Sequence, residues 1–335
     1  MLAYNLGSTL IFVGPGCKFK MDVSVIMTCH NEAAFVEAAL RSVVSQSSFH
    51  RVREILLVND GSTDDSASVL SQLAQEMDKL RVIVTSGVGV SAARNLALAE
   101  AVGGYIAFLD GDDIWSSCKL ERQLSVLESC ASIGLVYGDF YHFTKNDLAD
   151  AQLVHVRRYG RLEKDLLKSF FIYGGPVVPS TMLLRREVFA DSGYFDTTVN
   201  VGEDADMCLR IAERWQFEYV SGGLAYKRSH ANNATRSLEV ILSTASVLTE
   251  RCIARNARLA PYATKRMARR YAIVGNDRAK HGERLKAIWY LAKSLNADPL
   301  SWRTYAYLTF AILPPFLEAL FRRCAVAILQ QSRNF

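Results

Sequence analysis

The chain has 335 residues and a mass of 37.3 kDa; half of its residues are apolar and 22% are charged. This length predicts one large domain with a smaller appendage, and the apolar content excludes a globally disordered chain. The net charge of +5 is unevenly distributed: residues 241–335 carry 16 Lys and Arg against 5 Asp and Glu, whereas residues 1–240 carry 23 against 29. The basic C-terminal region favours a surface or polyanionic partner.

The seven cysteines include no pair at CxxC spacing, and their number is odd. A zinc ribbon and a disulfide scaffold are therefore disfavoured, and a reducing compartment fits better. Residues 1–20 contain only a short apolar stretch with no basic segment before it, which argues against a signal peptide. We expect residues 1–20 either to be disordered or to be a non-native leader, in which case natural translation begins at Met21.

Strands and helices alternate through the first half of the chain. Apolar, β-rich runs predict four strands, at residues 23–28, 54–58, 81–85 and 105–109. Apolar residues at helical spacing predict the intervening helices, at residues 35–44, 66–80 and 91–102. This order predicts an α/β fold with a mostly parallel, Rossmann-like sheet flanked by helices.

The pattern loosens after residue 115. Short strands are predicted at residues 134–137, 180–184, 217–220 and 223–226, and short helices at residues 120–127, 186–191 and 204–215. From about residue 237 onward the chain has the pattern of helices rich in Arg. We therefore predict a sheet domain over residues 21–236 and a basic amphipathic helical region over residues 237–335.

The longest apolar run, residues 305–317, has 13 residues and contains Pro314 and Pro315. A membrane-spanning helix needs about 20 apolar residues, so this run is too short to cross a bilayer. Aromatic residues precede the run, and Arg322 and Arg323 follow it. Helices that lie in a membrane interface and helices that pack against a protein body share this pattern, and both interpretations stay open.

In an open parallel sheet, ligands bind beyond the carboxyl ends of the strands. Polar and acidic residues follow three of the four predicted strands: Thr28 and Glu32, then Asp60, then Asp110, Asp112 and Asp113. Clustered carboxylates repel one another, and a bound cation relieves this repulsion. Asp110 and Asp112 alternate along an extended segment and can face one ligand. Hard oxygen ligands favour Mg²⁺ or Mn²⁺.

Structural explanations compete with each of these assignments. An Asp-rich turn is also a helix cap, and Glu32 at a helix start also serves the helix dipole. Arg94 lies about one turn into the helix that Ser91 opens, where it is either a ligand for a phosphate or base or a solvated side chain.

Residues 202–206 begin another helix with three acidic residues, which is more than capping requires. A carboxylate in this turn is a candidate general base. Further along, Lys227 and Arg228 are placed to face a diphosphate. His230 follows them, although a lone histidine is more often structural than a ligand.

Five segments, taken in order, resemble the family 2 glycosyltransferases, which have the GT-A fold. They are residues 23–32, 57–64, 89–95, 108–115 and 202–210. The resemblance extends from about residue 23 to about residue 230, some two thirds of the chain. It implies an inverting hexosyltransferase that uses a nucleotide-sugar, most simply a UDP-sugar, and a divalent metal, Mn²⁺ or Mg²⁺.

The resemblance also implies roles for single residues. Thr28, Glu32 and Asp60 would hold the uridine of the donor, and Arg94 would lie at its base or diphosphate. Asp110 would contact the ribose.

In the same resemblance, Asp112 would bind the metal that bridges the diphosphate, and His230 would be a second metal ligand. Asp204 would be the general base. Cys29 and His30 depart from the family pattern at the nucleotide end. No Gln-x-x-Arg-Trp sequence is present, which favours transfer of a single sugar over processive synthesis.

The acceptor that these features favour is a glycan or a lipid-linked acceptor, in surface polysaccharide synthesis. We expect the chain to be cytoplasmic, in peripheral contact with a membrane through residues 240–335, and to bind no nucleic acid. A sugar nucleotidyltransferase is disfavoured because the loop after the first strand has neither Gly nor Lys. The remaining alternative is a non-catalytic nucleotide-sugar-binding or scaffolding member of the same fold.

Overall fold

The computed structural model describes the chain over residues 2–6, 9–13, 20–144, 148–156, 165–174, 178–199, 201–229 and 238–313. The chain forms two compact units. The sheet unit comprises residues 1–164 and 176–231, and the helical unit comprises residues 165–175 and 232–335. Residues 165–175 were predicted to belong to the first domain, but their contacts assign them to the helical unit.

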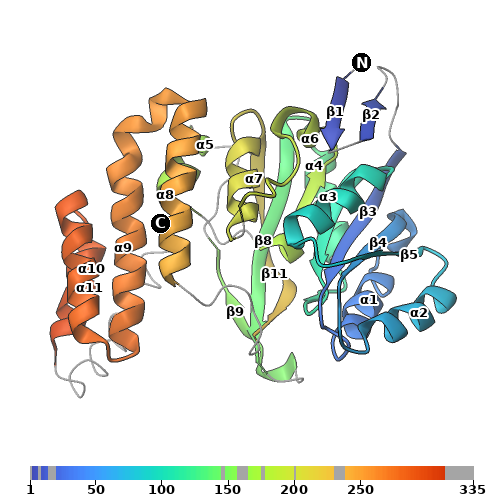
Figure 1. Ribbon diagram of the computed structural model, residues 1–335, viewed down its shortest axis with the longest axis horizontal. Helices are drawn as coiled ribbons and strands as arrows, with labels where there is room; N and C mark the ends of the chain where they lie inside the picture. The colour runs from blue at the N-terminus through green and yellow to red at the C-terminus, as the bar shows by residue number, and fades with distance from the viewer. Residues whose placement is uncertain are drawn as a thin grey trace. The chain divides into compact units, whose positions relative to one another are not determined.

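A mixed sheet forms the centre of the sheet unit (Figure 1). Its strands, over the described residues, are β3 (Lys20–Cys29), β4 (Val52–Asp60), β5 (Leu80–Thr85), β6 (Gly103–Asp110), β7 (Ile114–Trp115), β8 (Ile133–Phe143), β9 (Gln152–Val154), β10 (Leu183–Arg185) and β11 (Gln216–Arg228). Their order is β5-β4-β3-β6-β10-β8-β11-β7, and β9 pairs with β8.

Strands β5, β4, β3 and β6 run parallel to one another, as the alternating pattern predicts. Strand β10 is antiparallel to both β6 and β8, whereas β8 and β11 are parallel to each other. The two strands predicted at residues 217–220 and 223–226 form one strand, β11, whose pairing with β8 shifts register between Val220 and Ala225. The sheet is therefore mostly parallel, with an antiparallel insertion.

Helices cover both faces of this sheet because successive side chains of a strand point to opposite faces. On one face, Val23, Val25 and Met27 of β3 join a core with α1 (Val36–Val44), α2 (Ser66–Glu76) and α4 (Lys119–Glu128). On the other face, α3 (Val90–Glu100) packs on β3 and β4. The short α6 (Val188–Ser192) packs against α7 (Glu203–Ile211).

The N-terminal residues form a two-stranded antiparallel sheet of their own, from β1 (Leu2–Leu6) and β2 (Thr9–Val13). These strands pair with each other and not with the main sheet. The start of natural translation at Met21 stays a prediction.

The helical unit contains α5 (Leu166–Tyr173), α8 (Leu238–Arg255), α9 (Ala263–Lys280), α10 (Arg284–Ala297) and α11 (Trp302–Ile312) (Figure 1). Ala279, Ala287, Leu291 and Ala311 form a small core where α9, α10 and α11 meet. Helix α11 covers residues 305–312 of the predicted apolar run at residues 305–317, and residues 314–317 lie outside the described residues.

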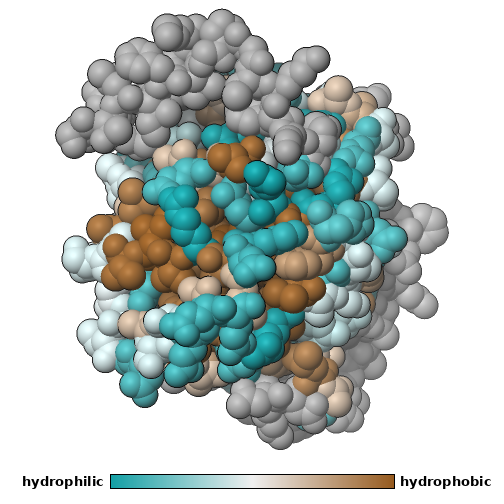
Figure 2. Space-filling model, turned by 90° about the vertical axis from the view of Figure 1, so that its right-hand side faces the viewer, coloured by the Kyte–Doolittle hydropathy of each residue, from teal (hydrophilic) through white to brown (hydrophobic). Residues whose placement is uncertain are grey.

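Within the described ranges, no helix is both long enough and apolar enough to span a bilayer. At the edge of the main sheet, Val84 of β5 has 72% of its surface exposed. Figure 2 views the side of the molecule that carries β5 and α2, and shows apolar side chains lying among hydrophilic ones.

Candidate active site

The parallel strands bring most of the predicted site residues to one edge of the sheet. Thr28 of β3 pairs with Asp110 of β6 on one side and with Val58 of β4 on the other. Asp60 ends β4 two residues beyond Val58. Thr28, Asp60 and Asp110 therefore stand at the carboxyl ends of three adjacent strands, as the sequence predicts.

The carboxylate of Asp60 accepts hydrogen bonds from the loop that leads into α3. Its Oδ1 accepts hydrogen bonds from the hydroxyl of Thr85 at 2.5 Å and from the amide of Val88 at 2.6 Å, and its Oδ2 accepts from the amide of Gly89 at 2.8 Å. Burial opposes ionisation, but these hydrogen bonds lower the pKa of Asp60 below its usual value. Asp60 thus stays ionised and fixes the loop beside the predicted uridine site.

Glu32 points into the carboxylate cluster. Its Oε2 is buried and makes no hydrogen bond within the described part of the chain. Burial and the neighbouring Asp112, Asp110 and Asp113 raise the pKa of Glu32 to about 9. A Cβ atom on Gly111 would lie 2.2 Å from this Oε2 and 2.9 Å from the carbonyl oxygen of Thr28, so only glycine fits between them.

Asp112 and Asp113 are both buried but have different surroundings. Asp113 accepts hydrogen bonds from the hydroxyl of Ser180 at 2.6 Å and from the amide of Arg228 at 3.0 Å. Burial, together with Asp112 and Asp110, raises the pKa of Asp113 to about 7. Asp113 therefore ties the motif to β11 and to Ser180.

Arg94 forms two ion pairs inside the site. Its Nη2 donates to Asp110 at 2.7 Å, and its Nη1 donates to Glu203 at 2.8 Å. Only 5% of the Arg94 side chain is exposed. Burial favours the neutral acid at Asp110, but the Arg94 guanidinium holds the pKa of Asp110 below its usual value. The polar contacts of Arg94 are thus with two carboxylates. The sequence predicted that Arg94 contacts the nucleobase or the diphosphate of the donor.

Asp204 lies in the first turn of α7, after Gly202, which has a φ of +82°. Its Oδ1 accepts a hydrogen bond from the amide of Ala205 at 2.6 Å. Burial and the adjacent Glu203 raise the pKa of Asp204 to about 7, against the opposing effect of Arg94. A carboxylate that titrates near neutrality is well matched to general base catalysis.

Lys227, near the end of β11, supplies positive charge to the same cluster. Burial lowers its pKa, but Asp113, Asp110, Asp112 and Asp204 together raise that pKa above its usual value. That Lys227 faces a diphosphate stays a prediction.

Glu203 was missed as a site residue in its own right. Its only signal in the sequence is membership of the acidic turn at residues 202–206, and its partner Arg94 lies 109 positions away. The predicted metal ligand His230 lies outside the described residues.

The acidic residues fit a divalent cation only in part. Among the residues that the structure describes, no three His, Cys, Asp or Glu side chains converge as a complete metal site. Mg²⁺ and Mn²⁺ are commonly held by one or two carboxylates, with substrate phosphates and waters completing the shell. Among the described residues the buried Oε2 of Glu32 has no hydrogen-bond partner, and Asp110, Asp112 and Asp113 raise the pKa of this carboxyl, so the surroundings of Glu32 disfavour a further negative charge and favour a cation.

The family model for glycosyl transferase family 2 matches residues 24–193, just over half of the chain. The chain belongs to this family. The matched segment contains the strand ends and the motif at residues 110–113, while the turn that carries Asp204 follows it.

Two relatives show the extent of the similarity. The uncharacterized glycosyltransferase alr2836 of Nostoc is 37% identical over 219 residues, which cover 64% of this chain and 66% of that protein. The UDP-Glc:alpha-D-GlcNAc-diphosphoundecaprenol beta-1,3-glucosyltransferase WfgD of Escherichia coli is 33% identical over 126 residues, which cover 38% of this chain and 48% of that protein. The chain thus covers less than two thirds of the length of either relative.

The mannosyltransferase PcManGT of Pyrobaculum calidifontis, solved with GDP-Man and Mn²⁺, is similar in structure. It matches with a TM-score of 0.56 and 18% identity over 94% of this chain and 83% of that one. At this identity the likeness establishes the fold, and the predicted GT-A architecture is confirmed.

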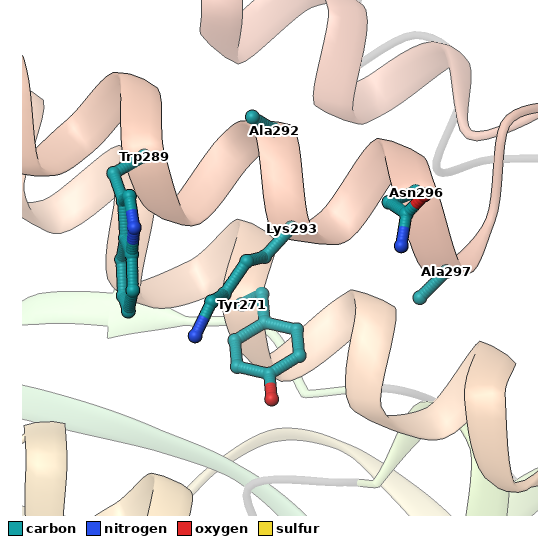
Figure 3. Close-up of a pocket in the computed structure, with 6 residues that line it drawn as sticks. All are labelled: Tyr271, Trp289, Ala292, Lys293, Asn296 and Ala297. Carbon is teal, nitrogen blue, oxygen red and sulfur yellow. The ribbon is translucent and has the colours of Figure 1, made fainter.

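A separate hollow of about 530 Å³ lies on the helical unit, between α9 and α10. Trp289, Lys293 and Asn296 of α10 and Tyr271 of α9 line it, and the side chains of Trp289, Lys293 and Tyr271 extend toward the same side (Figure 3). The Lys293 ammonium lies 3.7 Å from the centre of the Trp289 indole ring. This hollow contains none of the carboxylates described above.

Proposed function

We propose that the chain is an inverting, metal-dependent glycosyltransferase that transfers one sugar from a UDP-sugar to a hydroxyl group of a glycan or lipid-linked acceptor. The observation that carries the proposal is the group of carboxylates at the strand ends with the half-buried Asp204 in electrostatic contact with it. Family membership and the UDP-Glc named for the Escherichia coli relative support a UDP-sugar as donor.

In this proposal the donor lies along the strand ends. Thr28, Glu32 and Asp60 hold the uridine, and Asp110 contacts the ribose. Asp112, with His230 as a second ligand, holds Mn²⁺ or Mg²⁺. When bound, such an ion neutralises charge that develops on the departing diphosphate. The Mn²⁺ in the mannosyltransferase structure supports a divalent metal, although the donor there is GDP-Man.

The reaction in this proposal is a single displacement. The Asp204 carboxylate takes the proton of the acceptor hydroxyl as its oxygen attacks the anomeric carbon. The new carbon–oxygen bond forms on the face opposite the bond to the diphosphate, which breaks, so the configuration inverts. Lys227 lies on the leaving-group side and stabilises the negative charge that remains on UDP.

The helical unit supports the proposed membrane contact. Its hairpin of α10 and α11 exposes large apolar side chains: Leu285 (85%), Trp289 (53%), Leu300 (91%), Trp302 (57%), Tyr305 (50%) and Ile312 (61%). Basic residues accompany them in a region with 16 Lys and Arg against 5 Asp and Glu. Exposed aromatics with basic residues are typical of helices that lie in the interface of an anionic membrane. The lipid-linked acceptor named for the Escherichia coli relative agrees with this location.

A cytoplasmic location is part of the proposal. The described cysteines Cys29, Cys118, Cys130, Cys208 and Cys252 are free thiols, which suits a reducing compartment. A role in surface polysaccharide synthesis is also part of the proposal, and the sugar on a diphosphoundecaprenol carrier in the name of the Escherichia coli relative supports it.

Thermal unfolding with UDP, with and without Mn²⁺, tests the donor site, with GDP and CDP as controls. A ligand at a hundred times its dissociation constant stabilises a protein by about 2.7 kcal/mol, which shifts the midpoint by several degrees. We expect a shift with UDP that requires Mn²⁺. A shift with GDP or CDP alone overturns the uridine assignment, and no shift with any nucleotide favours a non-catalytic member of the family.

Replacing Asp204, the proposed general base, tests the proposed reaction mechanism. Asp204→Asn keeps the size and a hydrogen-bonding group but cannot accept the proton. We expect UDP binding to be kept and sugar transfer to fall by about 10²–10⁴-fold, the range for general base catalysis. Transfer at the wild-type rate overturns the assignment of Asp204.

A further inference from the structure

Arg94 connects three elements that are distant in the sequence. It lies on α3, and its two carboxylate partners are Asp110, the last residue of β6, and Glu203, the first residue of α7. Glu203 precedes Asp204 directly. One guanidinium therefore links the strand end that faces the donor to the turn that carries the proposed base.

The surroundings of Arg94 fix its position. Its guanidinium carbon lies 5.3 Å from the centre of the Phe195 ring, and Phe195 packs edge-to-face on Phe108 of β6. Asn95 holds the backbone of Phe195 with two hydrogen bonds, from its Nδ2 to the carbonyl at 2.8 Å and from the Phe195 amide to its Oδ1 at 2.9 Å. The planar guanidinium thus has one packed position, from which its fork reaches both carboxylates.

We propose that Arg94 is a positioning residue, which holds the first turn of α7 and Asp204 against the donor end of β6 instead of contacting the donor itself. This inference rests on the proposed function of the same site. Removing a partner from a buried ion pair leaves uncompensated charge. Without the guanidinium, Asp110 and Glu203 face each other as two anions, and the turn that carries Asp204 moves away. A displacement of about 1 Å at a reacting group lowers a rate by about 100-fold.

If Arg94 positions Asp204, it also changes the pKa of Asp204, which a residue that only stabilises the fold would not do. The charged and titratable groups that face Asp204 are Glu203 and Cys208 on its own helix, Arg94 on α3, Asp110 on β6 and Lys227 on β11. Glu203 raises the pKa of Asp204, and Arg94 lowers it. Replacing these two residues should therefore move the acid limb of the pH–rate profile in opposite directions.

The test compares Arg94→Gln, Arg94→Lys and Glu203→Gln with the wild-type chain, by kcat, donor KM, UDP affinity and the pH profile of kcat. We expect Arg94→Gln to lower kcat by about 100-fold, to leave UDP affinity unchanged and to move the acid limb to higher pH. Glu203→Gln moves the acid limb to lower pH. Arg94→Lys restores part of kcat, because one ammonium reaches one carboxylate but lacks the fork.

Arg210 supplies the matched control. It pairs with Asp206 at 2.8 Å on the same helix, and lies six residues after the proposed base. Arg210→Gln should leave the acid limb unmoved even if it lowers the unfolding temperature. If Arg94→Gln does not fold, Glu203→Gln provides the same test, because glutamine keeps the shape of the side chain.

Several results overturn the inference. The first is a loss of UDP affinity in Arg94→Gln as large as its loss of kcat, which makes Arg94 a donor contact. The second is an acid limb that neither variant moves. A wild-type chain that transfers no sugar overturns the proposed function, and this inference with it. An active wild type with a fully active Arg94→Gln variant overturns this inference alone.

Discussion

In the sheet unit, carboxylates are buried at the strand ends and large apolar side chains face the core. In the helical unit, tryptophans and leucines are exposed among lysines and arginines. Asp113 of the sheet unit has no exposed surface, whereas Leu300 of the helical unit has 91% of its surface exposed. Each unit thus carries an arrangement that is unfavourable for the isolated chain, since buried charges and exposed apolar groups both raise its free energy.

The difference indicates what each unit binds. Clustered carboxylates become favourable when a cation compensates their charge and a bound ligand donates hydrogen bonds to them. Exposed aromatic and aliphatic side chains become favourable when an apolar phase covers them. The sheet unit is therefore the better candidate for catalysis, and the helical unit is the better candidate for binding to a membrane. Each prediction below separates these two roles.

The largest effect is expected at Gly111, in the carboxylate cluster. Gly111→Ala places a Cβ atom against Glu32 and the backbone carbonyl of Thr28, which cannot move without shifting β3. We expect transfer to fall by about 100-fold, as for other small displacements of reacting groups, and stability to fall by about 1–3 kcal/mol from overpacking. Steady-state kinetics and denaturant unfolding measure the two effects.

Gly282, between α9 and α10, is the matched control in the helical unit. It also has a positive φ, of +78°, but nothing lies within 4 Å of the position of an added Cβ. Gly282→Ala therefore costs only the backbone strain, about 1 kcal/mol, and should keep full transfer activity. An active Gly111→Ala variant, or an inactive Gly282→Ala variant, breaks the comparison between the units.

The next effect is the response of activity to pH. Because the pKa of Asp204 is about 7, the carboxylate that can accept a proton is lost as the pH falls below that value. We expect kcat to fall by about tenfold for each pH unit below 7 and to level off above it. Residual transfer by Asp204→Asn should show no such limb. An acid limb of the same midpoint in that variant means that another group titrates.

Much of the fold is predictable from the sequence because its central strands are buried. The four predicted strands agree with β3, β4, β5 and β6 to within three residues at every end, because a continuous apolar run between two turns is typical of a buried strand. The division of the chain was less predictable. Residues 165–175 belong with the helical unit, where the carbonyl of Phe171 accepts a hydrogen bond from Arg266, a contact across 95 positions that no local pattern indicates.

The site was predictable where a single strand end defines it. Thr28, Asp60 and Asp110 come together because parallel strands end at one edge. Links between distant segments were not predictable in the same way. The pairing of Arg94 with Glu203 depends on how α7 meets α3, and the tie from Asp113 to Ser180 depends on the antiparallel insertion. The spacing of residues along the sequence does not indicate that either pair of residues lies close together.

The smallest effect is expected in the helical unit, on membrane binding. Replacing Trp289 and Trp302 by Ser removes two exposed aromatic side chains, each of which is worth about 1.5–3 kcal/mol when fully buried in an apolar phase. An interfacial position buries only part of each ring, so we expect the pair to weaken binding to anionic vesicles by about tenfold. Transfer to a soluble acceptor should not change, because neither residue lies in the sheet unit. Vesicle co-sedimentation and a soluble-acceptor assay measure the two properties.

The matched control is Val84→Ser, which removes an exposed apolar side chain from the edge strand β5 of the sheet unit; Val84 is 72% exposed, against 53% for Trp289 and 57% for Trp302. If the helical unit provides the membrane contact, Val84→Ser binds vesicles like the wild type, while the tryptophan variant is impaired. Equal binding by all three proteins means that the exposed hairpin does not contact lipid. Loss of binding only in high salt means that the basic residues carry the attraction, because electrostatic attraction to a membrane is screened within about 10 Å at 0.1 M salt and apolar contact is not.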